Sequence, residues 1–260
     1  MKLPIFQVDA FASEVFRGNP AAVVPLAEPL PAELMQKIAM ENNLSETAFI
    51  EASSPGRYGI RWFTPTVEVD LCGHATLASA HVVMTELEPG LGRVAFTSGV
   101  GLLEVDRSGD LLVLDFPSRP PKPVDVAPAI AEAMGKRPLE ALMSRDLVLV
   151  YETEADVVGL RPDFPKLGAA STFGVLATAK GDRVDFVSRC FFPAVDIDED
   201  PVTGSAHCSL IPFWAGRLGK SSFTARQRSS RGGELSCELK GDRVRIGGRV
   251  VPYLKGEITV

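Results

Sequence analysis

The segment RWFTP at residues 61–65 is followed within about a dozen residues by GHA at residues 73–75, where a strongly apolar stretch begins. The same arrangement returns later, where RCFFP at residues 189–193 precedes DPVTGSA at residues 200–206. Such self-similarity indicates an internal repeat of a strand, a loop and a helix start. The first N–H groups of a helix lack partners within the helix and carry the positive end of its dipole. If the two copies face each other, the cleft between them is a candidate anion-binding site.

The composition is that of an ordinary globular protein, with 260 residues of which 45% are apolar and 23% charged. A net charge of -6 argues against nucleic-acid and anionic-membrane partners, because both require clusters of Lys and Arg. No apolar run approaches the length of a membrane span, and the first residues alternate like a strand instead of forming a signal peptide. The four cysteines form no Cys-x-x-Cys pair, which argues against a disulfide framework or a zinc site. We therefore expect a cytoplasmic protein.

A proline-rich segment is the expected domain boundary. Four prolines occur within residues 117–123, where they remove backbone donors and stiffen an exposed connector. We expect an N-terminal lobe at residues 1–117 and a C-terminal lobe at residues 118–260, with a similar order of strands and helices in each. The last predicted strand, residues 250–260, either stays in the C-terminal lobe or crosses to the first.

Each lobe contains one helix that is apolar on nearly every face, at residues 75–84 and 206–218. A helix without a polar face must be enclosed, and strands are the main material available to enclose it. The predicted fold is therefore α+β, with two pseudo-symmetric lobes that each wrap a curved, mostly antiparallel sheet or barrel around a central helix. A surface helix is predicted at residues 31–42.

Glu46 is a candidate acid or base. It lies between apolar neighbours at the entrance to a predicted strand, in the segment NLSETAFI at residues 43–50. Burial there would favour the neutral carboxylic acid, as a proton-shuttling group requires, and Ser45 or Thr47 can orient the carboxyl group by hydrogen bonding. The same pattern also fits a solvated carboxylate in a loop between a helix and a strand.

The first repeat presents Gly73 and His74 at its helix start. Glycine at this junction lets the backbone approach a ligand, and the helix dipole favours a neutral imidazole that can exchange hydrogen bonds with a substrate. A capping or buried structural histidine fits the same pattern. Cys72, directly before Gly73, is either a thiolate activated by the helix dipole or a small buried apolar residue.

The second repeat places the acidic run DED at residues 198–200 before its helix. We assign the first two acids to capping of the helix N-terminus. Asp200 differs, because Pro201 holds it extended and so aims its carboxylate into the cleft instead of back at the helix. Gly204 and Ser205 then offer N–H groups and a hydroxyl to a substrate carboxylate.

Sequence templates for cofactors and metals are missing. No Gly-x-Gly-x-x-Gly follows a strand, no Gly-x-x-x-x-Gly-Lys occurs, and the three histidines form no His-x-x-x-His pair. No Gly-x-Ser-x-Gly surrounds a serine nucleophile. Proton transfer without a cofactor or a metal is the chemistry that remains.

Three separated segments, SET at residues 45–47, GHAT at 73–76 and DPVTGS at 200–205, resemble the PhzF-like phenazine-biosynthesis isomerase family of the diaminopimelate-epimerase superfamily. FQVDAF at residues 6–11 and GNPAAVV at 18–24 resemble it as well. The resemblance implies two lobes, each a sheet rolled around a helix, with an active site between them, no cofactor, and pairing into homodimers. It also implies that Glu46 moves a proton, with Gly73, His74, Asp200 and Ser205 around the substrate.

Our hypothesis is a cofactor-independent isomerase that moves a proton between carbons of a small carboxylate-bearing substrate, with Glu46 as base and then acid. One alternative is a two-base amino-acid epimerase or racemase using Cys72, since one catalytic cysteine of the epimerase branch stands just before the matching glycine. That chemistry needs a second thiol, whereas this chain offers Asp200 in the second loop, and Cys208 should point into the barrel. Another alternative is a non-catalytic protein that binds a carboxylated metabolite.

Overall fold

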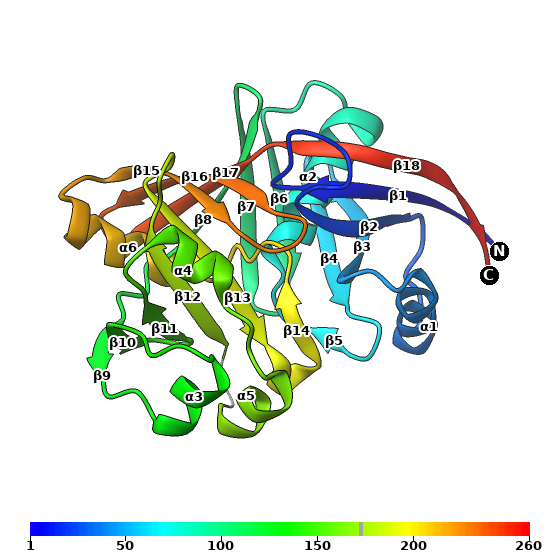
Figure 1. Cartoon of the computed structure of the whole chain (residues 1–260). Helices are drawn as coiled ribbons and strands as arrows, with labels where there is room; N and C mark the ends of the chain where they lie inside the picture. The colour runs from blue at the N-terminus through cyan, green and yellow to red at the C-terminus, as the bar shows by residue number, and fades with distance from the viewer. Residues whose placement is uncertain (172–173) are drawn as a thin grey trace. The chain divides into compact units, whose positions relative to one another are not determined.

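The computed structural model describes residues 1–171 and 174–260. By its internal contacts the chain divides into two compact units (Figure 1). Unit 1 comprises Met1–Asp115 together with Gly247–Val260, and unit 2 comprises Phe116–Ile246. Unit 1 is thus built from two separate segments of the chain, and unit 2 from one.

Unit 1 is a curved, mostly antiparallel sheet in which helix α2 packs against strands β1, β2 and β3. Its elements are β1 (Lys2–Ala10), β2 (Asn19–Leu26), α1 (Ala32–Asn42), β3 (Glu46–Ser54), β4 (Arg57–Phe63), β5 (Glu68–Val69), α2 (Gly73–Val82), η1 (Val83–Leu87), β6 (Arg93–Ser98), β7 (Gly101–Ser108), β8 (Leu111–Pro117) and β18 (Val250–Thr259). Eight of the ten residues of α2 are buried, as expected for a helix without a polar face. The predicted helix at residues 75–84 begins two residues earlier, at Gly73, and continues as the π-helical turn η1.

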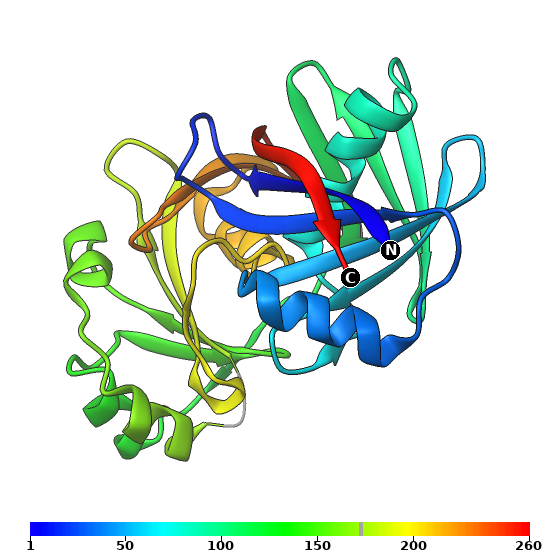
Figure 2. The same ribbon diagram turned by 90° about the vertical axis from the view of Figure 1, so that its right-hand side faces the viewer.

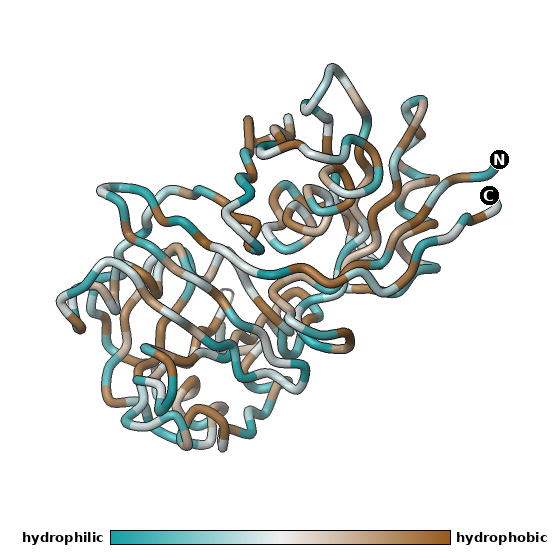
Figure 3. Tube along the Cα trace, turned by 90° about the horizontal axis from the view of Figure 1, so that it is seen from above, coloured by the Kyte–Doolittle hydropathy of each residue, from teal (hydrophilic) through white to brown (hydrophobic). Residues whose placement is uncertain are grey.

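Helix α1 is the predicted surface helix, and it covers the outside of the unit 1 strands (Figure 2). Met35, Ile38 and Ala39 on its buried side pack in a cluster with Phe49 and Phe63 of β3 and β4. Hydrophobic and hydrophilic residues are intermixed along the trace (Figure 3), and buried positions alternate along β8, as expected for a strand with one apolar face.

The last strand, β18, belongs to unit 1. It pairs antiparallel with β1 from Lys2 opposite Thr259 to Ala10 opposite Val250. The Val260 N–H donates to the Met1 carbonyl at 2.9 Å, so the two termini lie side by side (Figures 1 and 2).

Unit 2 repeats the topology of unit 1. Its elements are β9 (Lys122–Val124), α3 (Pro128–Ala133), β10 (Glu140–Met143), β11 (Leu147–Val150), α4 (Glu154–Gly159), α5 (Phe164–Ala170), β12 (Val175–Lys180), β13 (Phe186–Phe192), η2 (Pro193–Val195), β14 (Ile197–Asp200), α6 (His207–Leu218), β15 (Ser222–Gln227), β16 (Gly233–Lys240) and β17 (Arg243–Gly248). In unit 1, β2 pairs parallel with β3, β3 antiparallel with β4, and β4 parallel with β6. In unit 2, β11, β12, β13 and β15 follow the same sequence of pairings.

Helix α6 occupies the place in unit 2 that α2 occupies in unit 1. Trp214 is buried on it, stacks on Phe186 with a ring-centroid distance of 5.7 Å, and donates from Nε1 to Thr178 Oγ1 at 3.0 Å. Cys208 is buried, as expected for a side chain directed toward the sheet. The helix begins at His207, one residue after the predicted start.

The proline-rich segment follows the break between the two units, which falls between Asp115 and Phe116, and Pro117, Pro120 and Pro123 are exposed. Alternate residues of β8 point inward, so Phe116 is buried and the strand continues to Pro117. Residues 122–124 form β9, which pairs with β10 and places Pro123 opposite Leu142. Proline is tolerated there because β9 is a short strand with exposed residues. Within the described residues, no helix is long and apolar enough to span a membrane.

Candidate active site

Glu46 and His74 meet in unit 1. Glu46 is the first residue of β3, and His74 is the second residue of α2. His74 Nε2 lies 3.0 Å from Glu46 Oε2, and the two side chains are only 6% and 12% exposed. The carboxyl group is therefore largely withdrawn from water, which excludes the solvated-loop alternative for Glu46.

The other imidazole nitrogen of His74 faces two further side chains. Nδ1 lies 3.2 Å from Asn19 Nδ2 and 3.5 Å from Cys72 Sγ. Asn19 is fully buried at the start of β2. It directly follows Gly18, whose φ is 67°, and a Cβ on Gly18 would lie only 2.1 Å from the Ala10 carbonyl oxygen. Asn19 is not among the site residues predicted from the sequence. The signal available was a polar amide between a glycine and a proline at the mouth of a strand.

The pKa of His74 is set by its buried neighbours. Burial lowers the pKa of His74, but attraction to Cys72 and Glu46 and hydrogen bonds to both outweigh burial and hold that pKa well above its ordinary value. The neutral imidazole expected from the sequence stays a prediction, since the Asn19 amide nitrogen, a donor, faces Nδ1 at 3.2 Å. A carboxylate 3.0 Å away acts more strongly on the ring than the end of a helix does.

Cys72 is a buried thiol. Burial and the nearby Glu46 carboxylate raise the pKa of Cys72 to about 11, although His74 and the Ala75 backbone act in the opposite direction. The thiol is accordingly protonated at neutral pH. Of the two interpretations left open by the sequence, the activated thiolate is not favoured, because desolvation outweighs the helix end.

Glu46 is oriented by His74 and not by Thr47. Thr47 Oγ1 accepts a hydrogen bond from Asn42 Nδ2 at 3.0 Å, and consecutive strand residues point to opposite faces. The expectation that Thr47 orients the carboxyl group is therefore wrong. Ser45 directly precedes β3 and is half-buried.

Three potential metal ligands come together in the structure, since Glu46, Cys72 and His74 each offer a donor atom within 4.8 Å of the others. Cys72 and Glu46 lie against different nitrogens of one imidazole, the thiol at Nδ1 and the carboxylate at Nε2. A metal ion binds an imidazole through one ring nitrogen, so it would reach only one of the two other ligands without rearrangement. The arrangement fits an acid–base pair better than a metal centre.

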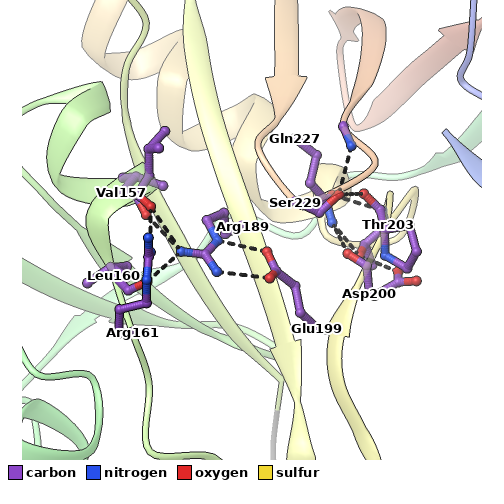
Figure 4. A network of polar contacts seen from close by, with 12 residues as sticks. Val157, Leu160, Arg161, Arg189, Glu199, Asp200, Thr203, Gln227 and Ser229 are labelled. Atoms are coloured by element: carbon purple, nitrogen blue, oxygen red, sulfur yellow. Dashed lines mark hydrogen bonds and ion pairs between the residues drawn. The ribbon is translucent and has the colours of Figure 1, made fainter. Parts of the chain in front are cut away.

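The second group of predicted residues lies in unit 2, at the loop before α6. The Thr203 hydroxyl donates to Asp200 Oδ2 (Figure 4). One oxygen of the Asp200 carboxylate is therefore bonded to a residue that leads into the helix, and the expectation that Pro201 aims the carboxylate into the cleft stays a prediction. Gly204 and Ser205 lie in a tight turn, in which their carbonyls accept from the N–H groups of the first two residues of α6, each at 3.1 Å.

Glu199 is not a helix cap. It forms a two-pronged ion pair with Arg189, with distances of 2.7 Å from Nε to Oε1 and 2.9 Å from Nη2 to Oε2 (Figure 4). The capping assignment is wrong because residues 198–200 belong to strand β14, next to β13. Arg61 and Glu68 make the same two-pronged contact in unit 1, at 2.7 Å and 2.7 Å. The repeated arginine thus fastens a short strand ahead of each central helix.

The strand registers identify corresponding positions in the two units. Because Arg61 corresponds to Arg189, Trp62 corresponds to Cys190. Trp62 pairs with Val69 and Cys190 pairs with Asp200, so Val69 corresponds to Asp200. Three residues further along the chain, Cys72 therefore corresponds to Thr203. By the same count Gly73 and His74 correspond to Gly204 and Ser205. Phe63 corresponds to Phe191 in the same way. Thr47 pairs with Phe63 and Val175 pairs with Phe191, so Thr47 corresponds to Val175 and the preceding residues, Glu46 and Gly174, correspond to each other.

In unit 2 the position that corresponds to Glu46 is Gly174, where a side chain would fit only if its neighbours moved. A Cβ on Gly174 would lie 2.2 Å from the Phe192 ring and 2.8 Å from Asp146 Oδ1. The two copies of the repeat therefore differ in chemistry, with the pair Glu46 and His74 in unit 1 and the residues Gly174 and Ser205 in unit 2.

Comparison with known proteins extends this description. The family model of the phenazine biosynthesis-like proteins (PhzC-PhzF) matches residues 8–256. Two proteins of Pseudomonas aeruginosa, each named an uncharacterized isomerase, are 52% and 48% identical to the chain, and each match covers 99% of both proteins. The crystal structure of a PhzF-family phenazine biosynthesis protein from Enterococcus faecalis is 48% identical and superposes with a TM-score of 0.97, with 100% of each chain covered.

A more distant structure supports the predicted fold class. A hydroxyproline epimerase from Agrobacterium vitis matches with a TM-score of 0.60 at 10% identity, covering 99% of this chain and 92% of the epimerase. The predicted epimerase-like α+β fold is thereby confirmed. With a family model and close relatives that match over nearly its full length, the chain belongs to the phenazine biosynthesis-like (PhzC-PhzF) family and is an isomerase.

Proposed function

We propose that the chain moves a proton between two carbons of one small carboxylate-bearing substrate, with Glu46 as the single acid–base group. The observation that carries the proposal is the contact of Glu46 Oε2 with His74 Nε2 at 3.0 Å, with both side chains largely buried. A buried carboxylate beside an imidazolium is a base with its charge balanced and little water to compete for the proton.

The proposed reaction has two proton transfers. Glu46 takes a proton from the carbon next to the substrate carboxylate, and the electron pair left on that carbon delocalises toward the carboxylate. The His74 imidazolium balances the charge that develops. Glu46, now a neutral acid, returns the proton to another carbon of the conjugated system, so the double bond moves and the Glu46 carboxylate is restored. No proton or electron is gained or lost overall.

We assign substrate binding to residues at both helix starts. The first N–H groups of α2, at Gly73 and His74, precede the first backbone hydrogen bond of the helix, which Thr76 donates to the Cys72 carbonyl. In unit 2 we assign the same role to Gly204 and Ser205, with Asp200 contacting a polar group of the substrate. Ser45 is proposed as a binding residue next to Glu46.

The asymmetry of the repeat favours a one-base mechanism. A two-base epimerase needs an acid–base group on each side of the reacting carbon. In unit 2 the position matching Glu46 is a glycine, where a side chain would fit only if its neighbours moved, and the position matching Cys72 is Thr203. The buried Cys72, with its pKa raised to about 11, is a poor base at neutral pH. These features support the isomerase hypothesis over the two-thiol alternative.

Deuterium exchange tests the proposal. The protein is incubated in heavy water with small unsaturated cyclic carboxylates, beginning with cyclohex-2-ene-1-carboxylate, and the position of the double bond and of deuterium is followed by NMR. We expect Glu46→Gln to lower turnover by about a hundredfold to ten-thousandfold while binding is retained. Glu51→Gln, on the same strand, is the matched control and should retain full activity. Undiminished turnover by Glu46→Gln would remove Glu46 from the mechanism.

Two further arms separate the alternatives. Cys72→Ser should keep most of the isomerase activity. If the protein were a thiol-dependent epimerase, the native protein would invert a stereocentre of its substrate and Cys72→Ser would lose that activity. If the native protein binds a carboxylate of the panel without introducing deuterium into any compound, the non-catalytic binding protein is favoured.

A further inference from the structure

We propose that Gln227, at the end of β15, is a positioning residue that fixes the Asp200 carboxylate and the turn before α6 for substrate binding. This inference rests on the proposed function, because it takes the loop at residues 200–205 as part of the substrate site. Gln227 is fully buried, and its side chain reaches a loop that lies more than twenty residues away in the sequence.

Both ends of the Gln227 amide are used on this loop. Oε1 accepts a hydrogen bond from the Thr203 N–H at 2.8 Å. Nε2 donates to the Asp200 carbonyl at 2.7 Å and to Thr203 Oγ1 at 3.2 Å (Figure 4). The amide thus bridges the first and last residues of the segment Asp200–Thr203.

The orientation of this amide follows from its partners. Turning it over would place an NH2 group against the Thr203 N–H and an oxygen against the Asp200 carbonyl, and both contacts would be repulsive. With Nε2 donating to Thr203 Oγ1, the hydroxyl hydrogen of Thr203 is left to donate to Asp200 Oδ2. A chain of hydrogen bonds therefore leads from Gln227 through Thr203 to the Asp200 carboxylate, and such chains strengthen one another.

The backbone of Gln227 lies between two neighbouring strands. It pairs with Ser188 of β13 on one side and with Gly233 of β16 on the other. Just beyond it, Ser229 Oγ donates to the Pro201 carbonyl at 2.7 Å and accepts from the Gly232 N–H at 3.0 Å. One connection between two paired strands thus holds the loop at three backbone groups, which are the carbonyls of Asp200 and Pro201 and the N–H of Thr203.

Unit 1 has no matching amide at the corresponding position. Gly59 in unit 1 corresponds to Val187 in unit 2. Gly59 pairs with Thr97 and Val187 pairs with Arg226, so the residues that follow these partners, Ser98 and Gln227, correspond to each other. Ser98 Oγ donates at 3.0 Å to the carbonyl of Gly101, in its own hairpin. Symmetry of the fold therefore does not account for the glutamine, and its contacts point to a requirement of the loop at residues 200–205.

Hydrogen exchange of the ligand-free protein tests the contact itself. In Gln227→Met, a side chain of similar length without polar atoms, we expect the Thr203 amide to exchange at least tenfold faster than in the native protein. Gln36→Leu is the matched control, because Gln36 Nε2 donates to the Thr64 carbonyl in unit 1 at 2.9 Å and does not touch this loop. Unchanged exchange at Thr203 in Gln227→Met would overturn the proposal. This measurement needs no substrate, so it stands even if the proposed reaction fails.

Steady-state kinetics tests the positioning role, with the substrate that turns over fastest among the unsaturated cyclic carboxylates of the deuterium-exchange experiment. A displaced binding group can cost on the order of a hundredfold, so we expect Gln227→Met to lower kcat/KM by about ten- to a hundredfold, mainly through KM. In an Asp200→Asn background the same substitution should lower kcat/KM less than about threefold, because Gln227 acts through Asp200. Effects that simply multiply, or a lowered Tm with unchanged kcat/KM, would overturn the proposal.

A second pair of variants covers the case in which Gln227→Met does not fold. Thr203→Ser keeps the hydroxyl that links Gln227 to Asp200, and Thr203→Val removes it while leaving the backbone N–H in place. We expect Thr203→Ser to retain native KM and Thr203→Val to raise it about tenfold. Equal KM values in the two variants would show that the hydrogen-bond chain does not position Asp200.

Discussion

At the scale of single residues, the charge on His74 depends on Glu46. The ring is buried at the start of a helix, and both features disfavour a cation. Attraction to Cys72 and to the Glu46 carboxylate at 3.0 Å reverses this balance, and the pKa of His74 lies well above its ordinary value. His207, which is equally buried, shows the opposite case, because burial lowers its pKa to about 4 and its Nδ1 contacts the uncharged Thr203 carbonyl at 2.9 Å. A neighbouring charge, and not burial, thus distinguishes the two histidines.

We therefore expect Glu46→Gln to lower the pKa of His74. NMR titration of the three histidine side chains measures this, with the His207 signals as a reference that should not titrate between pH 5 and pH 9. The folded-state pKa of His74 is raised, so the pairing stabilises the native protein fully below the unfolded value of about 6.5 and is lost as pH rises through the folded-state value. The difference in unfolding free energy between the native protein and Glu46→Gln should accordingly be larger at pH 6 than at alkaline pH. An unchanged His74 titration would contradict the coupling.

At the scale of elements, the arginine of the repeat makes the same ion pair in both units, but it is exposed in one unit and buried in the other. Arg61 and Arg189 each pair with a glutamate on the next short strand, and each lies over a phenylalanine ring at 5.2 Å and 5.0 Å. The side chain of Arg61 is 43% exposed and that of Arg189 is 10% exposed. Arg189 Nη1 also donates to the Val157 and Leu160 carbonyls at 3.2 Å and 2.8 Å, and so ties the end of α4 to the sheet (Figure 4).

The difference in burial predicts unequal costs for the same substitution. Arg189→Met leaves the largely buried Glu199 carboxylate without its arginine, and breaking such a buried pair costs about 3–5 kcal/mol. Arg61→Met removes an exposed pair, which is worth about 0–1 kcal/mol. Both variants lose a comparable contact with a phenylalanine ring, so the difference in stability reflects the burial of Arg189 together with its hydrogen bonds to the carbonyls at the end of α4. Denaturant unfolding measures it, and equal losses of stability would contradict the argument.

Most elements could be predicted from the sequence because their signals are local. The apolar helices, the hairpin turns near Gly109 and Gly241, and the repeat itself follow from spacing along the chain. The role of Glu199 could not, because a strand at residues 197–200 is recognisable only from its pairing with β13. Asn19 and Gln227 were missed for a similar reason, since their partners lie 55 and 24 residues away. The charge of His74 depends on a residue from another strand and so could not be inferred from its helix alone.

At the scale of the whole molecule, unit 1 is closed by a strand from the far end of the chain. β18 pairs with β1 over the full length of that strand, and the sequence left its placement undecided. The pairing satisfies backbone groups along β1 that would otherwise form an open edge. Unit 1 thus depends on two segments separated by the whole of unit 2.

Removal of β18 should therefore affect the two units differently. In a chain that stops at Arg249, we expect the melting temperature to fall by about 10 °C, which corresponds to a few kcal/mol in a protein of this size. Hydrogen exchange should accelerate along β1 and β2 and much less along β12 and β13. Glu257→Gln, which alters an exposed β18 side chain and keeps the strand, is the control. Equal acceleration in both units would contradict the division of the chain.

The discontinuity of unit 1 also bears on how the protein is made. A ribosome releases residues 1–115 first, then all of unit 2, and only afterwards the residues of β18. Throughout that interval the nascent first unit exposes an unsatisfied strand edge, while unit 2 can complete its own sheet from one continuous stretch. Such an edge recruits strands from neighbouring polypeptides, so the period before termination is the time of greatest aggregation risk and the stage at which a chaperone would be of most use.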